Sequence, residues 1–422
     1  MLQSNFKILG ITAAVMLALA SLSACEIHIK DDGIPGSGHV ISEERKLATF
    51  DNVINESPFD VIVNVDGKSG VMVEGDDNFV KEVETSVEGG KLIVRNKRRN
   101  SNFHFSWGNR PTTITISVAS LSKASNSGSG DLRLRQINNE KLELTNEGPG
   151  DLSVSGTSKE VELHSSGSGD SNLRQLTIMT AKLDLSGPGD TELGEINTAF
   201  SAHLSGSGDL NVAKMHTEST KITISGPGCA SLRGVTKNLD ADMSGSGDLS
   251  VDEISAETTN LVLSGPGEAT LVGETKNLRV RASGSGGFDA SRLRVESADI
   301  RNSGPADISF KIAKGEVVLD VSGSGDVDGD FSDVAKIDVT ADGPGDLNFH
   351  GSAKKLNATL NGSGNLEASS LLLELASVKV NGPGEARVNV KANGSGETST
   401  IKNGSRQVTI DQNGVVRHGR DD

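Results

Sequence analysis

The stretch that decides the fold is residues 167–190, which read GSGDSNLRQLTIMTAKLDLSGPGD. It is bounded by two glycine turns, Gly-Ser-Gly-Asp at 167–170 and Gly-Pro-Gly-Asp at 187–190. The same turn recurs about every 20 residues, and a fixed period of this length predicts stacked, similar units. The steps alternate between two lengths that differ by one residue, until a shorter last step. Serine and proline also alternate in the middle of the turn, which indicates that a pair of units, such as 128–166, was duplicated. The turns begin at Gly128, Gly148, Gly167, Gly187, Gly206, Gly226, Gly245, Gly265, Gly284, Gly323, Gly343, Gly362, Gly382 and Gly394, with Gly304-Pro305-Ala306 as a degenerate member.

Apolar residues occupy constant positions between these turns. They lie four and six residues after the first glycine of one turn and six, four and two residues before the next, as in Leu152 and Val154 followed by Val161 and Leu163. A spacing of two is typical of β-strands, in which alternate residues share a face. Each repeat is therefore predicted to contain two short strands that are joined by a polar turn and closed by the glycine turn.

Two short strands bury too little surface to be stable alone, so the repeats must stack. The sequence predicts an all-β fold, a parallel β-solenoid or β-helix with about 20 residues per coil and two facing sheets. The usual crossover preference predicts right-handed winding. About fourteen coils at ~4.8 Å would give a rod near 70 Å long. A coil made of two repeats, with the two kinds of glycine turn at opposite corners, is the alternative geometry.

The composition fits this architecture and excludes several classes of protein. Hydrophobic residues make up 34% of the 422 residues and aromatic residues only 3%, so burial depends on aliphatic side chains in many thin layers. The formal net charge of −16 argues against a nucleic-acid partner, because phosphate backbones require a concentrated basic surface. Cys25 and Cys229 can form at most one disulfide, which excludes a disulfide-rich scaffold.

The N-terminus has the layout of a secretion signal, with Lys7, an uncharged run at 8–24 and then Cys25. The residues Leu22-Ser23-Ala24-Cys25 resemble the bacterial lipobox, which implies that 1–24 is a lipoprotein signal peptide and that Cys25 carries palmitate-like acyl chains. Several acyl chains hold a protein firmly to a membrane. Glu26 follows in place of Asp, which implies the outer membrane, on either its periplasmic or its exposed side. An uncleaved anchor is the alternative.

The pattern divides the rest of the chain into four parts. Residues 25–38 are predicted to be a polar tether, and residues 39–126, which lack the glycine turn, to form irregular β coils and an N-terminal cap. Residues 127–396 carry the repeat solenoid. Residues 397–422 lose the period and become polar, as expected for a C-terminal cap or tail.

An acidic residue follows most of the glycine turns. With one repeat per coil, these carboxylates would form a column with one member every ~4.8 Å, where repulsion between neighbours in water is about 0.9 kcal/mol. A cation is therefore permitted but not required. One interpretation is that each carboxylate caps amides of the adjacent turn. The other is a weak calcium ladder, although calcium prefers six to eight oxygen ligands. The candidate calcium ligands are Asp131, Asp151, Asp170, Asp190 and Asp209.

Several motifs together resemble a known family. The motifs are Gly38 to Phe50, Val61-Ile62-Val63-Asn64-Val65, Gly75-Asp76-Asp77-Asn78, Gly89-Gly90-Lys91-Leu92-Ile93-Val94 and the repeated Ser-Gly-Ser-Gly-Asp. They are similar to the head GIN domain family of auto-transporter adhesins over nearly all of the mature chain. The resemblance implies a pectin-lyase-like β-solenoid at a bacterial cell surface, with a role in adhesion. It carries over no catalytic residues.

Residues 95–110 are the one compositional anomaly, because basic and aromatic residues gather there in an acidic chain. Arg98, Arg99 and Trp107 are candidate ligand contacts, since aromatic rings beside arginines can stack on sugars or meet an anionic glycan. The alternative is a hairpin whose aromatic side chains cap the open end of the solenoid core.

Three classes of function remain open. The first is a non-catalytic lipoprotein of the cell envelope that binds glycan or protein ligands, and the second is a passive structural spacer. The third is a carbohydrate-active enzyme, such as a polysaccharide lyase or hydrolase. Solenoid enzymes concentrate unlike residues in one groove and interrupt the repeat there, whereas here the repeat continues regularly. We therefore expect a binding protein without catalytic residues or a cofactor, attached to the membrane by its lipid. The sequence contains no heptad pattern of the kind that predicts a coiled-coil oligomer, so we expect a monomer.

Overall fold

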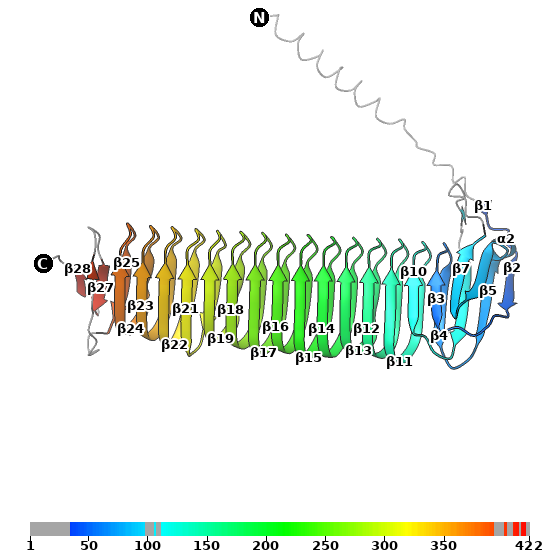
Figure 1. The fold of residues 1–422 in the computed structure, drawn as a ribbon, viewed down its shortest axis with the longest axis horizontal. Helices are drawn as coiled ribbons and strands as arrows, with labels where there is room; N and C mark the ends of the chain where they lie inside the picture. Colours follow the sequence, from blue (N-terminus) through cyan, green and yellow to red (C-terminus); the bar gives the residue numbers. More distant parts are fainter. Residues whose placement is uncertain are drawn as a thin grey trace, which may run out of the picture.

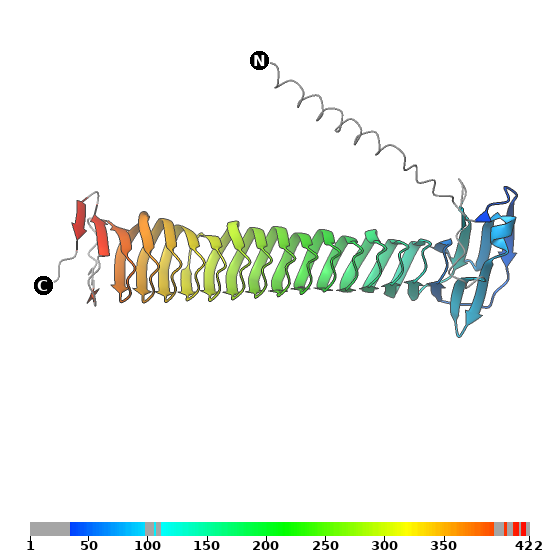
Figure 2. The ribbon, with the colours of Figure 1, turned by 90° about the horizontal axis from the view of Figure 1, so that it is seen from above.

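The computed structural model describes residues 34–97, 105–106, 111–391, 401–402, 408–412 and 415–418, and these form one long rod (Figure 1). The repeat strands lie side by side along the rod, with their turns aligned along its two edges. The view from above shows the same coils wound about one axis (Figure 2). There are about 13 coils of roughly 20 residues, so the parallel β-solenoid predicted from the sequence is confirmed.

The rod consists of strands β11 to β25, most of which run the full length of a coil between two glycine turns. They are β11 (Leu132–Asn146), β12 (Leu152–Ser165), β13 (Ser171–Leu185), β14 (Thr191–Leu204), β15 (Leu210–Ile224), β16 (Ala230–Met243), β17 (Leu249–Leu263), β18 (Ala269–Ala282), β19 (Phe288–Asn302), β20 (Ile308–Ile312), β21 (Glu316–Val321), β22 (Val327–Ala341), β23 (Leu347–Leu360), β24 (Leu366–Val380) and β25 (Ala386–Val390).

Each repeat makes one coil. Strand β11 pairs with β12 in parallel, with Leu132 opposite Leu152, and β12 pairs with β13, with Leu152 opposite Ser171. Residues in register are thus one repeat apart in the chain, which matches the period of the sequence. The alternative coil made of two repeats is therefore excluded.

The cross-section of a coil differs in one respect from the two facing sheets expected from the sequence. Most coils are one long strand with two bends, which in β15 are marked by pairs of adjacent exposed residues, so that its buried residues fall into three runs. In β15 the middle run contains Met215 and Thr217, in a region that the sequence pattern assigns to a polar turn. In several coils one residue at the first bend has positive φ, as at Gln136 (60°) and Gly156 (129°). The pairing between coils is interrupted at such a bend, as between Leu134 and Ile137 of β11, where the register shifts.

The glycine turns lie directly over one another. The backbone amides of Ser205 and Gly206 both donate to the carbonyl of Leu185 in the preceding coil, over 2.8 and 3.1 Å. A Cβ at Gly206 would lie 2.1 Å from the carbonyl oxygen of Gly187. No side chain fits at that distance, which explains why glycine recurs at this corner.

The core is a continuous aliphatic column with a short aromatic segment. Buried Leu, Val, Ile and Ala side chains fill it from Val53 to Val390. The rings of Phe310, Phe331 and Phe349 stack edge to face on successive coils, with centroids 5.7 and 5.2 Å apart. Each layer is thin, so the stability of one coil depends on its two neighbours.

The N-terminal end of the rod is closed by a cap of mixed strands. Strands β3 and β4 begin the solenoid by pairing with β10 and β11, and β7 and β9 cover their other edge. Beyond these, β5 pairs antiparallel with β2 and β9, and β6 pairs antiparallel with β7. The short helix α2 buries Phe79 and Val80. The elements are β1 (Ile34–Pro35), β2 (Val40–Arg45), β3 (Asn52–Asn55), β4 (Asp60–Val65), β5 (Gly70–Asp76), α2 (Asp77–Val80), β6 (Val83–Glu88), β7 (Lys91–Asn96), β8 (Phe105–Ser106), β9 (Thr113–Val118) and β10 (Lys123–Asn126).

At the C-terminal end, β25 pairs with β27 and β27 pairs antiparallel with β28. The strands there are β26 (Ile401–Lys402), β27 (Val408–Gln412) and β28 (Val415–His418). Across the described ranges of the chain, no helix has the length and hydrophobicity needed to cross a membrane.

Candidate functional site

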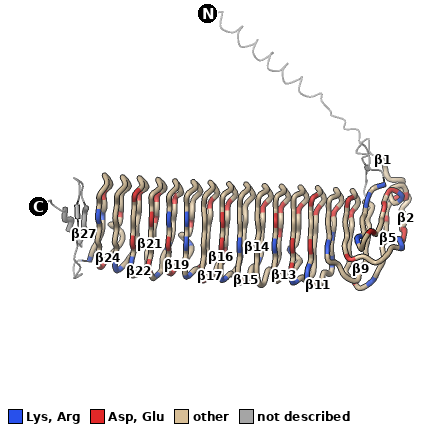
Figure 3. The backbone as a smooth tube through the Cα atoms, viewed as in Figure 1, with Lys and Arg blue, Asp and Glu red and all other residues tan. Residues whose placement is uncertain are grey.

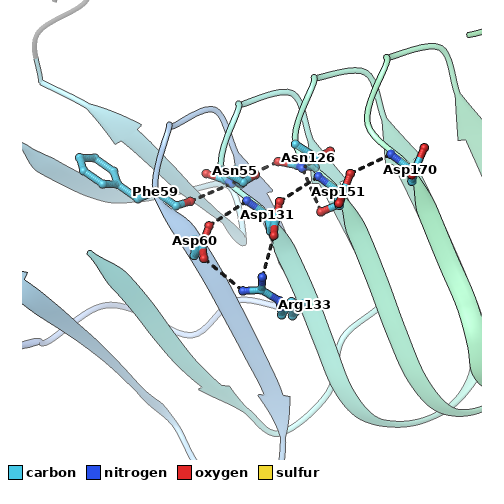
Figure 4. Close-up of polar contacts among 10 residues, drawn as sticks. Asn55, Phe59, Asp60, Asn126, Asp131, Arg133, Asp151 and Asp170 are labelled. Atoms are coloured by element: carbon cyan, nitrogen blue, oxygen red, sulfur yellow. Dashed lines mark hydrogen bonds and ion pairs between the residues drawn. The ribbon is translucent and has the colours of Figure 1, made fainter. Parts of the chain in front are cut away.

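The acidic residues after the glycine turns form a single column along the rod, which we call the acid ladder. Its members are linked by hydrogen bonds from coil to coil (Figure 4). The amide of Asp151 donates to Oδ1 of Asp131 over 3.1 Å, and the amide of Asp170 donates to Oδ1 of Asp151 over 2.9 Å. The pattern continues through Asp190 and Asp209. Each carboxylate thus caps an amide, but the amide belongs to the next coil rather than to its own turn.

The structure brings the five candidate calcium ligands together in this column. One oxygen of each already accepts an amide hydrogen bond from the coil that follows it. Among the residues that the structure describes, no group of three or more His, Cys, Asp or Glu side chains is placed to hold a metal ion. Calcium binding by the ladder stays a hypothesis that requires a direct measurement.

Three positions of the ladder are not acidic, namely Cys229, Gly287 and Asn365. Cys229 takes one rung, where its Sγ accepts the amide of Asp248 over 3.4 Å and so replaces a carboxylate oxygen. Gly287 takes another rung and provides no acceptor at all. The ladder therefore lacks a carboxylate at each of these three coils, although Asn365 still accepts the amide of Glu385 over 2.9 Å.

Buried asparagines beside the turns bond to the next glycine turn, which was not expected from the sequence. Asn126 is fully buried, and its Nδ2 donates to the carbonyl of Gly150 over 3.0 Å. Asn146 makes the same bond to Gly169. The sequence signal that could have revealed them is a polar residue two positions before a glycine turn, where most repeats have an apolar residue.

Cross-coil ion pairs cover the outward faces of the rod. Lys182 lies 2.9 Å from Glu162, and this hydrogen bond is the main reason that the pKa of the Glu162 carboxyl is below its ordinary value. Lys214 lies 2.8 Å from Glu195 and lowers the pKa of that carboxyl in the same way. Because these pairs are exposed, each contributes little to stability, but together they fix the positions of charged groups on the surface.

A shallow polar groove of about 230 Å³ crosses three coils near the start of the regular rod. The register shifts between β11, β12 and β13 at this place, because β12 is one residue shorter than its neighbours, and the side chains leave a hollow there. Guanidinium, hydroxyl and carboxamide groups converge on it and can bind the hydroxyls or a carboxylate of a sugar. The polar lining side chains are Arg133, Arg135, Ser153, Ser155, Asn172 and Gln175.

Arg133 is held in place at the edge of this groove. Its guanidinium lies 2.6 Å from Asp131 and 3.2 Å from Asp60 (Figure 4). Arg135 makes no ion pair within the described residues, so its guanidinium is available to a ligand. The sequence did not predict this groove, because the groove depends on which residues of three separate repeats lie next to one another.

The other predicted site residues cannot be compared with this geometry. Cys25, Arg98, Arg99 and Trp107 all lie outside the described residues. Lipidation of Cys25 and ligand contact by the other three residues therefore stay predictions.

The fold and this surface together define a class, the long parallel β-solenoids whose repeated polar positions face outward in columns. Within that class, the chain matches the family model described as "Putative auto-transporter adhesin, head GIN domain" over residues 49–251, 234–328 and 308–405. These matches cover most of the chain, so the protein belongs to this family. The family expected from the sequence motifs is thereby confirmed.

Solved structures that are similar to this chain come from Bacteroides fragilis and Parabacteroides distasonis. A putative adhesin from Bacteroides fragilis is 22% identical and has a TM-score of 0.45, covering 52% of this chain and all of its own. Two proteins from Parabacteroides distasonis, a putative lipid binding protein and a putative adhesin, are 18% and 14% identical with TM-scores of 0.21 and 0.23. They cover 79% and 80% of this chain and 98% and 99% of their own. No curated protein matches the chain. The family assignment depends on the family model alone.

Proposed function

We propose that this protein is a non-catalytic, adhesin-like component of the bacterial cell envelope that binds glycan or protein ligands along its rod. Membership in an adhesin family supports the role. The lipobox-like residues before Cys25 support attachment to the outer membrane by a lipid. The solenoid then holds its outward side chains away from the membrane surface.

The observation that carries this proposal is the arrangement of outward side chains in straight columns on a stiff scaffold. Backbone ladders join successive coils, and the acid ladder adds a side-chain bond between most of them. Groups in one column are therefore presented at a fixed spacing of ~4.8 Å. A polymeric ligand can contact several coils at once, and weak contacts then add up to useful affinity.

Binding is tested with the purified full chain in a neutral detergent. The probes are envelope polysaccharides, peptidoglycan and extracellular matrix proteins, each with and without calcium. We expect retention by at least one of them, without release of small products. A spacer would bind none of the probes, and release of unsaturated or reducing sugars would show that the protein is an enzyme.

The anchor is tested separately, and the two cysteines of the chain provide a matched pair. Cys25→Ser is expected to abolish labelling by a palmitate analogue and to release the protein from membranes. Cys229→Ser, which changes the same atoms in the solenoid, is expected to leave both unchanged. Labelling that persists in Cys25→Ser would refute lipidation at this residue.

A further inference from the structure

Two coils near the middle of the rod are basic, although the chain as a whole is acidic. Strands β18 and β19 with their connecting turn, residues 269–302, contain six Lys and Arg against four Asp and Glu, whereas the whole chain has 41 against 57. Figure 3 shows blue Lys and Arg segments on neighbouring coils in this part of the rod. We name four residues on these strands the arginine collar: Arg279, Arg281, Arg292 and Arg294.

The collar arginines differ from the other arginines of the rod because none of them makes an ion pair within the described residues. Elsewhere, Arg174 lies 3.3 Å from Glu192, Arg387 lies 3.1 Å from Glu367, and Arg233 pairs with Glu253. Outside the collar, only Arg135 is similarly unpaired among the arginines with described side chains. Unpaired guanidinium groups are thus concentrated on two adjacent coils.

The register in this region places like charges next to each other. Arg281 lies opposite Arg301 of the next coil, and Arg294 lies opposite Lys311. Like charges at the spacing of adjacent strands repel each other. Arg301 is paired with Asp299 over 3.4 Å, which leaves Arg281 without a carboxylate partner. Two carboxylates also lie in register with the collar, Asp299 opposite Arg279 and Glu274 opposite Arg294, but neither makes an ion pair with its arginine.

The acid ladder also loses a rung between these two strands. Gly287 lies in the turn that joins β18 to β19, where most coils have Asp or Glu. Space does not force this change, because a Cβ at Gly287 would come no closer than 3.7 Å to any atom. The same coils that gain unpaired arginines have therefore lost a carboxylate that would fit.

We propose that the arginine collar is a binding site for an acidic polysaccharide that crosses the rod at these two coils. Guanidinium groups bind carboxylates through paired hydrogen bonds, and they lose little hydration when they do so. The collar runs from the straight part of β18, with Arg279 and Arg281, to the first bend of β19, with Arg292 and Arg294. Because Arg279 is in register with Asp299 and Arg294 with Glu274, the two pairs of arginines lie on adjacent faces of the rod, and a polymer that contacts both pairs must wrap around the edge between these faces.

The surroundings favour a glycan over an acidic protein. Protein interfaces are centred on buried aromatic or aliphatic side chains. Here, the exposed large hydrophobic residues on these and the adjoining coils are Val262, which lies opposite Arg281, and Val318, which lies opposite Asp299. Two separate valines do not make an apolar centre, whereas a hydrated polymer needs none.

This inference rests on the proposed binding function and names its ligand, so the test separates the two. The full chain in neutral detergent is titrated with polygalacturonate, with dextran as a neutral polymer and with polyglutamate as an acidic polypeptide. The collar variant changes all four collar arginines to Gln. The control variant, Arg174→Gln, Lys214→Gln, Arg233→Gln and Arg387→Gln, removes the same charge from residues that make ion pairs.

We expect polygalacturonate to bind the native chain and to be released between about 50 and 300 mM salt, as the Debye length shortens. The collar variant should bind at least tenfold more weakly, and the control variant less than threefold more weakly. Gly287→Asp, which leaves every arginine in place and fits the available space, should weaken binding severalfold. Its unfolding midpoint should not fall below that of the native chain, which shows that weaker binding is not caused by a folding defect.

Equal binding by the collar and control variants would overturn the collar as the site. If the chain still bound polygalacturonate, the proposed binding function would stand. Binding of polyglutamate as tight as that of polygalacturonate would overturn the assignment to a glycan. Absence of binding to polygalacturonate would overturn this inference alone, because the wider screen of polysaccharides and proteins decides the proposed function.

Discussion

The glycine corners provide the sharpest test of the stacked-turn architecture, because the chain contains a matched control. In Gly206→Ala, the new Cβ would lie 2.1 Å from the carbonyl oxygen of Gly187, whereas ordinary contact begins at 3.4 Å. Two adjacent coils must therefore separate by roughly 1 Å at this corner. The separation stretches the two hydrogen bonds that Ser205 and Gly206 donate to Leu185.

The expected cost follows from these two effects. Overpacking typically costs about 1–3 kcal/mol, and two weakened hydrogen bonds add up to about 1 kcal/mol each. We therefore expect Gly206→Ala to destabilise its part of the rod by about 2–5 kcal/mol. Gly287 lies in the corresponding turn between β18 and β19, but the new Cβ of Gly287→Ala would be 3.7 Å from its nearest contact, the carbonyl oxygen of Asp307. This variant should change the free energy of unfolding by less than about 1 kcal/mol.

The assay combines urea unfolding, followed by circular dichroism, with hydrogen exchange of peptides from the rod. A solenoid is stabilised coil by coil, so the damage should be local. Gly206→Ala should lower the unfolding midpoint and deprotect amides of β13, β14 and β15, while Gly287→Ala should do neither. If the two variants had the same midpoint and the same exchange pattern, the reasoning from close-packed glycine corners would be refuted.

Three further predictions concern the acid ladder and the N-terminal cap. Asp190→Ala should lower the free energy of unfolding by about 0.5–1.5 kcal/mol, because it leaves the amide of Asp209 without an acceptor. Asp190→Asn should be nearly neutral, because Asn365 already accepts the amide of Glu385 in this way. Equal unfolding midpoints of the two variants in urea would contradict this prediction. Calcium should not raise the unfolding midpoint of chelator-treated protein, because one oxygen of each of these carboxylates already accepts an amide hydrogen bond. A rise of the midpoint that saturates with calcium concentration would establish the calcium ladder. Hydrogen bonds from Lys81 and Ser37 lower the pKa of Asp77 from 3.8 to about 2. The ionised carboxylate therefore stabilises the cap above pH ~4, and this contribution should be lost as the pH falls toward 2. An NMR titration of Asp77 with a midpoint near 4 would refute this prediction.

The sequence alone determined the period, the strands and the glycine corners. These features depend on local rules, namely the alternation of residues such as Leu152 and Val154 and the closeness of backbones at a stacked turn such as Gly206. The column of acidic residues followed directly once each repeat was assigned to one coil. The same logic failed at the middle of the repeat, where buried residues such as Thr217 are polar and do not stand out from a turn.

Tertiary structure alone decided which side chains meet across coils. Asp131 was expected to cap its own turn, but it caps the amide of Asp151, one coil away. Arg233 forms an ion pair with Glu253 of the next coil, whereas Arg281 lies opposite Arg301. These partners are a whole repeat apart in the chain, and their register shifts wherever a coil is one residue shorter at its bend. Local sequence rules do not contain that shift, because it is set by how two whole coils pack against each other.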